Sequence, residues 1–136
     1  MSIQKNLVLG VLIAVTTLGR AEAPLPYSAS PMELIALPEY CQVRLAPEGR
    51  YSSHVVSMWT ARVGGRDVWL HIHHYCHGIK FMNRAQSTMT RQHKQYYLQQ
   101  AVREFDYVLS RWSKDTQLWA DAAMRKQMAE MFLKFA

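Results

Sequence analysis

Apolar residues recur at helical spacing through most of the second half of the chain. Over residues 91–112 the apolar stripe consists of Leu98, Ala101, Val102, Phe105, Val108, Leu109 and Trp112. Over residues 116–135 it consists of Leu118, Trp119, Ala122, Ala123, Met128, Met131, Phe132 and Phe135. Spacing of three and four predicts an amphipathic helix over each range. Asp115 or Ser113 is placed to cap the second of them.

A further helix is predicted over residues 69–86, and it is apolar on two sides. One face carries Ile72, Tyr75, Cys76, Ile79 and Met82. The other carries His74, Gly78, Phe81 and Ala85. Gly78 and Ala85 are seven residues apart, so they stack two turns apart and leave room for a close helical neighbour. A helix of this kind is expected to lie between other elements.

Proline and serine positions organise the chain before that helix. Residues 22–37 read as an extended lead-in and a short helix, because Ser30-Pro31 has the order of an N-cap and a first helical residue. Pro38 is expected to stop this helix after Leu37.

Residues 38–51 contain a proline and a glycine and are predicted to be irregular. Ser52 or Ser53 can cap a short helix, and Gly64-Gly65 can end it as a turn. The predicted fold class is therefore all-α, a small helical bundle with an irregular N-terminal region, in which residues 38–136 form a single α-rich domain.

The N-terminus has the order of a secretory signal peptide over residues 1–21. Lys5 gives a positive charge, Leu7–Leu18 is apolar, and small residues allow cleavage after Ala21 or Ala23. The apolar run is shorter than the roughly 20 residues that a spanning helix needs. We therefore expect a periplasmic or secreted protein. An uncleaved membrane anchor is the alternative, and it is the case in which the chain would contact a membrane.

Composition is that of a globular protein with a mild positive charge. Hydrophobic residues make up 49% of the chain, which argues against general disorder. The net charge is +6, but Lys5 and Arg20 lie in the export segment. The remaining excess is small and shows no dense basic stripe, so a nucleic-acid partner is not expected.

The chain has two cysteines, Cys41 and Cys76. An oxidising compartment permits their pairing. A bridge would close a loop of about 35 residues and contribute roughly 3–4 kcal/mol in the chain-entropy model. Two separate buried thiols are the alternative.

Four of the six histidines lie within the seven letters HIHHYCH. His73 and His77 are one helical turn apart, which is the spacing of paired zinc or copper ligands. A free Cys76 could join them, so the metal and disulfide hypotheses compete for one sulfur. Lys80 and Arg84 continue the same flank, and two fixed cations disfavour another. No cofactor is therefore expected, with Cu or Zn as the alternative.

Other candidate chemistry is sparse. Cys76 and His77 are adjacent, so on a helix they do not face each other as a nucleophile and its base would. Phosphate-binding glycine loops and serine nucleophile elbows are missing from the sequence. Met124, Met128 and Met131 could bind Cu(I), but methionine at helical spacing is more typical of adaptable core. We expect a protein that is not an enzyme.

The segment from Leu70 to Trp112 resembles a tetratricopeptide repeat. Gly78, Phe81, Ala101 and Phe105 match the family's small and aromatic packing positions in type and order. The linker between the two helices is longer than the family norm, and Ser113 stands where the closing proline is usual. We therefore expect a hairpin over residues 69–112 and a third helix over 116–135. A generic helical bundle is the alternative.

The resemblance implies recognition of a protein or peptide in a concave groove. Such arrays usually need about three units, and this chain has one to one and a half. The N-terminal half would then act as the cap. The function that this predicts is an exported protein–protein interaction or scaffolding module of the bacterial cell envelope, whose partner is another envelope protein or a peptide. The alternative is a periplasmic Cu- or Zn-binding protein that uses residues 71–77.

Overall fold

The computed structural model describes residues 27–136, and these residues form helices joined by short connections, with no strand among them. The predicted signal peptide lies outside the described residues. The helices are α1 (Pro31–Ile35), α2 (Glu39–Leu45), α3 (Ser53–Arg62), α4 (Arg66–Ser87), α5 (Arg91–Arg111) and α6 (Gln117–Phe135). The all-α prediction is confirmed. No helix in this part of the chain is long and apolar enough to cross a bilayer.

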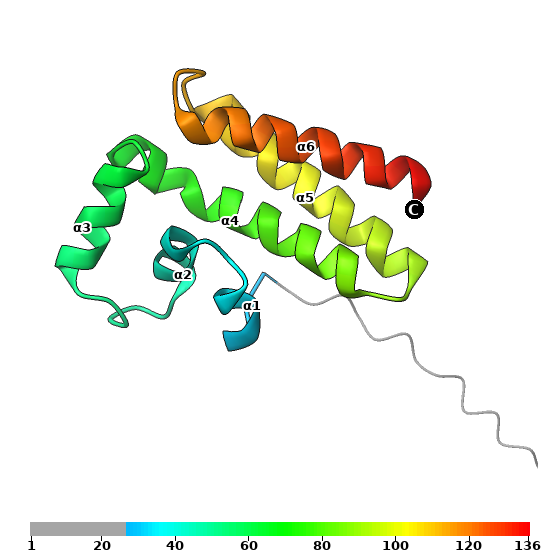
Figure 1. Cartoon of the computed structure of the whole chain (residues 1–136), viewed down its shortest axis with the longest axis horizontal. Helices are drawn as coiled ribbons and strands as arrows, with labels where there is room; N and C mark the ends of the chain where they lie inside the picture. The colour runs from blue at the N-terminus through cyan, green and yellow to red at the C-terminus, as the bar shows by residue number, and fades with distance from the viewer. Residues whose placement is uncertain (1–26) are drawn as a thin grey trace, which may run out of the picture.

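The three long helices form an antiparallel stack in which α5 lies between α4 and α6 (Figure 1). The short helices α2 and α3 contact α4, and α1 packs on α2. Helix α4 is thus packed on two sides, as its two apolar faces predict. The core lies mainly between α4 and α5, where Ile72, Tyr75 and Phe81 meet Ala101, Phe105 and Val108.

The four residues of the predicted hairpin contact lie together at this interface. Phe81 is 1% exposed, and Ala101 and Phe105 are fully buried. A Cβ added to Gly78 would lie 2.6 Å from Cε1 of Phe105. Only glycine lets the ring come this close to the backbone of α4.

A disulfide joins Cys41 of α2 to Cys76 of α4, as predicted from the two cysteines. Both residues are fully buried, and their Cα atoms are 5.4 Å apart. The bridge fixes the N-terminal half of the described chain to the long-helix stack. A disulfide of this kind fits an oxidising environment.

Two features of the N-terminal half follow the sequence, and one does not. Ser30 forms a capping box with Glu33 at the start of α1, and Ser52 caps α3. The prediction that residues 38–51 are irregular is wrong for Glu39–Leu45, which form α2. Pro38 precedes that helix, where its missing N–H costs nothing, and burial of Cys41 against α4 stabilises a turn-and-a-half too short to show a periodic pattern.

Helix α6 differs from its prediction in its cap and in its buried face. Neither Asp115 nor Ser113 caps it: Thr116 is the N-cap residue, without a side-chain hydrogen bond to the helix. Ala122 and Ala129 are its buried residues. Three residues of the predicted stripe are largely exposed instead, namely Met128, Met131 and Phe135. The reason is that α6 packs mainly on α5, and one neighbour covers only a narrow face.

Candidate functional site

One face of α4 carries a file of basic and imidazole side chains at steps of four, three and four residues: His73, His77, Lys80 and Arg84. Lys80 is only 1% exposed and Arg84 only 6%. Burying a cation is costly unless polar partners replace its hydration. The groups that meet these cations therefore define the site.

The partners of Lys80 and Arg84 come from the chain just before and within α1. The Lys80 Nζ donates to the main-chain carbonyls of Tyr27 and Ser28. The Arg84 Nη2 donates to the same Ser28 carbonyl at 2.7 Å. Arg84 also donates to both carboxylate oxygens of Glu33, at 2.5 and 3.1 Å. Two buried cations thus hold residues 27–33 against α4.

The pKa values of this group reflect the same contacts. The hydrogen bond from Arg84 is the main cause that lowers the pKa of Glu33 to about 2. Burial, reinforced by the charge of Arg84, lowers the pKa of Lys80 to about 8. Glu33 is therefore a carboxylate at neutral pH, and Lys80 is still protonated there in most molecules.

Glu104 of α5 completes the site from the opposite wall. It is 5% exposed and accepts hydrogen bonds from the Tyr27 hydroxyl at 2.6 Å and from Nδ1 of His74 at 2.7 Å. The Tyr27 ring meets His77 and Phe81 edge-on, each at 5.2 Å between centroids. Burial, and then the bond to Glu104, raises the pKa of Tyr27 to about 12, so its hydroxyl remains a donor.

The histidines of the HIHHYCH segment have separate surroundings. His71 Nδ1 lies 3.3 Å from the Tyr107 hydroxyl, and His73 Nδ1 accepts from Arg44 at 3.5 Å. Burial, followed by the neighbouring His74 and Arg44, lowers the pKa of His73 to about 4. Burial, followed by the charge of Lys80, lowers the pKa of His77 to about 3. Both of these side chains are neutral at pH 7.

The predicted metal ligands His73, His77 and Cys76 do not form a three-ligand set. The Cys76 sulfur is bonded to Cys41, so the prediction that it could join the histidines is wrong for the disulfide form. Within residues 27–136 there is no group of three or more histidine, cysteine or acidic side chains arranged to hold a metal ion. The predicted disulfide, rather than the metal, takes this sulfur.

A second candidate lies on the outer side of α6. Met124, Met128, Met131 and Phe135, here called the α6 row, follow one another at steps of four, three and four residues. Their exposed fractions are 52%, 37%, 47% and 85%. Spacing of this kind aligns side chains along one side of a helix. The sequence placed three of these residues in the core, so the row is found only in the structure.

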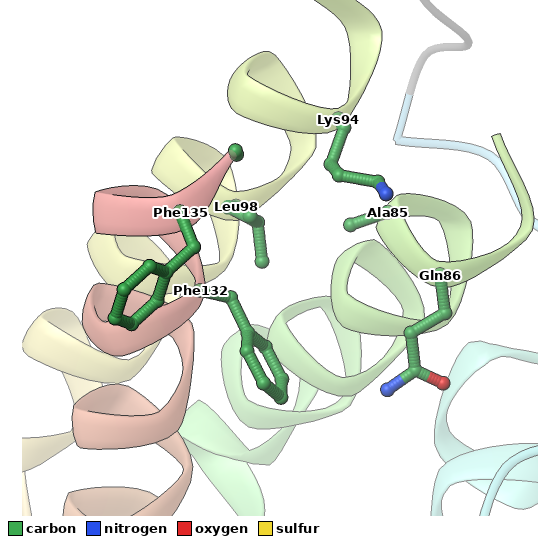
Figure 2. Close-up of a pocket in the computed structure, with 7 residues that line it drawn as sticks. Ala85, Gln86, Lys94, Leu98, Phe132 and Phe135 are labelled. Atoms are coloured by element: carbon green, nitrogen blue, oxygen red, sulfur yellow. The ribbon is translucent and has the colours of Figure 1, made fainter. Parts of the chain in front are cut away.

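A pocket of about 350 Å³ adjoins the Phe135 end of the α6 row, where the last turn of α4 meets the first turns of α5. Figure 2 shows Leu98 and Phe132 at this pocket, with the Lys94 amine and the Gln86 amide at its edges. Its lining is mainly apolar, with these two polar groups at the rim. Such a shape suits one large apolar side chain.

Sequence reasoning did not find Tyr27 or Glu104. Glu104 falls three residues after Ala101 and seven after Tyr97, on the edge of the buried stripe of α5. An acidic residue at that register is a signal of a buried polar contact. Nothing in the residues around Tyr27 indicates that it returns to α4 and α5.

No family model, curated protein or solved structure matches this chain.

Proposed function

We propose that this protein is an exported helical module that binds another protein of the bacterial cell envelope through the α6 row. The observation that carries the proposal is the second apolar face of α6. The helix already buries Ala122 and Ala129 against the stack, yet it presents three methionines and a phenylalanine outward. A helix with two apolar faces is suited to lie between two neighbours, and α5 supplies one of them.

The occupant that suits the row is an amphipathic helix of the partner. The row extends over eleven residues, roughly 16 Å, which matches about three turns of a facing helix. Methionine adapts its shape to a neighbour, which suits a docking surface. The charges beside the row are mixed, since Lys126 pairs with both Asp106 and Glu130. Recognition would then depend on apolar packing, with one large side chain entering the pocket of Figure 2.

The cellular location rests on the sequence pattern of residues 1–21 and on the disulfide. The Cys41–Cys76 bridge supports a compartment in which disulfides persist, such as the periplasm or the exterior. Mass spectrometry of the exported protein should find cleavage after Ala21 or Ala23. An intact N-terminus would instead favour the membrane-anchored form. The four packing residues Gly78, Phe81, Ala101 and Phe105 support a tetratricopeptide-like hairpin as the scaffold, without a catalytic role.

The test of the docking surface uses two methionine substitutions of the same chemistry. Met131→Glu places a charge in the middle of the α6 row, whereas Met89→Glu changes a residue that is 99% exposed in the connection between α4 and α5. Partners would be captured from envelope extracts with each variant and with wild type, by a photo-crosslinker at residue 128. We expect the wild-type chain and Met89→Glu to crosslink to the same apolar helical segment of one protein, and Met131→Glu to lose it.

Equal capture by both variants would contradict the assignment of the row. Crosslinks between two copies of this chain would replace the foreign partner with a self-association function. Light scattering of the purified protein separates these cases, because the proposal expects a monomer whose mass does not change in Met131→Glu.

A further inference from the structure

The chain's own N-terminal segment is bound between α4 and α5 in the manner of a peptide ligand. Ser28 and Ala29 have no regular secondary structure, and the segment joins no strand. Its attachments to α4 and α5 come from side chains of the receptor side. Lys80 and Arg84 hold the carbonyls of Tyr27 and Ser28, and Glu104 holds the Tyr27 hydroxyl.

The receptor groups are built into the core, and the ligand segment is not. Lys80, Arg84 and Glu104 are 1%, 6% and 5% exposed, while Tyr27 is 46% exposed. Buried charges of this kind need polar partners. The groove therefore has a standing requirement for carbonyl oxygens, one hydroxyl donor and one carboxylate, and any segment that supplies them can occupy it.

The contacts define what the groove reads. Carbonyl contacts at Tyr27 and Ser28 depend on an extended backbone and not on side-chain identity. Two side chains are read directly: Tyr27 by Glu104, and Glu33 by the bidentate contact of Arg84. These two lie six residues apart. Between them, Met32 is 76% exposed and is not held by either cation.

The fold can release this segment and remain joined. Cys41 in α2 is covalently bound to Cys76 in α4, so the chain is anchored immediately after α1. Release would open only the residues before that anchor. The core between α4, α5 and α6 does not include them, apart from the contact of Tyr27 with Phe81.

From these observations we propose a second binding site, independent of the α6 row. The groove between α4 and α5 is a receptor site for an extended polypeptide segment that carries a tyrosine and, six residues later, an acidic side chain. Residues 27–33 of this chain are its intramolecular competitor. A partner segment must displace them, so the site is shielded until such a segment is present at sufficient concentration.

The test uses the full exported chain with its disulfide intact and a labelled peptide of residues 27–36. The probe is the peptide Tyr-Ser-Ala-Ser-Pro-Met-Glu-Leu-Ile-Ala, and binding is followed by fluorescence anisotropy. In wild type the attached segment competes. Tyr27→Phe removes only the hydroxyl that Glu104 holds and keeps the ring. Loss of a hydrogen bond to a charged group should lower the occupancy of the attached segment, so the peptide should bind about tenfold more tightly to this variant.

Changes in the peptide test the same site without affecting the fold of the protein. Replacing its tyrosine with Phe, or its Glu33 equivalent with Gln, should each weaken binding to the Tyr27→Phe chain by about tenfold. A peptide with Met32 changed to Gln should keep its affinity. The proposal is overturned if Tyr27→Phe binds the peptide no better than wild type does, or if the Met32 change weakens binding as much as the tyrosine change. Loss of the α6 partner in Met131→Glu is unrelated to either outcome.

Discussion

Gly78 lies against the ring of Phe105, and three ring carbons would stand within 2.9 Å of a Cβ at that position. The ring is fully buried, so it has little room to retreat. We expect Gly78→Ala to lower the free energy of unfolding by about 2 kcal/mol, because overpacking costs about 1–3 kcal/mol and exceeds the helix propensity that alanine gains. Urea denaturation measures this. In a Phe105→Leu background the same change should cost less, and an equal cost would show that the ring is not the obstacle.

The disulfide should contribute a large share of the stability of the N-terminal half. It closes a sequence separation of 35 residues between α2 and α4. Reduction of the wild-type protein should lower the free energy of unfolding by roughly 3–4 kcal/mol, by the entropy that the unfolded chain regains. Thermal unfolding followed by circular dichroism, with and without a reductant, measures it. The Cys41→Ala/Cys76→Ala variant is the control, since a reductant should not change its midpoint.

Acid should destabilise the protein through His73 and His77. Their folded pKa values of about 4 and about 3 lie below the unfolded value of about 6.5, so the unfolded chain binds more protons between these limits. The contribution is fully present above pH 6.5 and is lost as the pH falls toward 4. Glu33 acts in the same direction at lower pH, because its folded pKa is about 2. Denaturation curves at pH 7, 5.5 and 4.5 should show a steady fall in the free energy of unfolding.

A variant isolates the histidine contribution to this pH dependence. His77→Phe replaces the ring whose Nδ1 is buried without a hydrogen-bond partner. It should flatten the fall between pH 6.5 and 4.5. An unchanged slope would assign the acid sensitivity to other groups.

Metal content decides between the binding module and the alternative Cu- or Zn-binding function. We expect protein purified without a histidine tag to carry well below one equivalent of Cu or Zn, because His73 lies beside Arg44 and the Cys76 sulfur is in a disulfide. Elemental analysis by plasma mass spectrometry measures this. Stoichiometric metal that is lost in His73→Ala would establish the alternative instead.

Local features of this structure could be read from neighbouring residues alone. The periodic stripe of α5 predicts its bounds to within one residue, and Ser30 predicts the start of α1. Both depend on interactions within one helical turn or along one helix face. By contrast, α2 is too short to show a period, and its formation depends on burial of Cys41 under α4.

The sequence by itself determined that this chain is helical, where its long helices lie, which glycine admits a close neighbour, and which two cysteines could pair. Those properties follow from spacing along one chain segment. Only the tertiary structure decided that Glu104 receives Tyr27, that Lys80 and Arg84 hold the segment before α1, and that Met128, Met131 and Phe135 face outward. The physical reason is that burial and ion pairing depend on which helices become neighbours. A stripe of apolar residues has the same sequence signature whether another helix covers it or not.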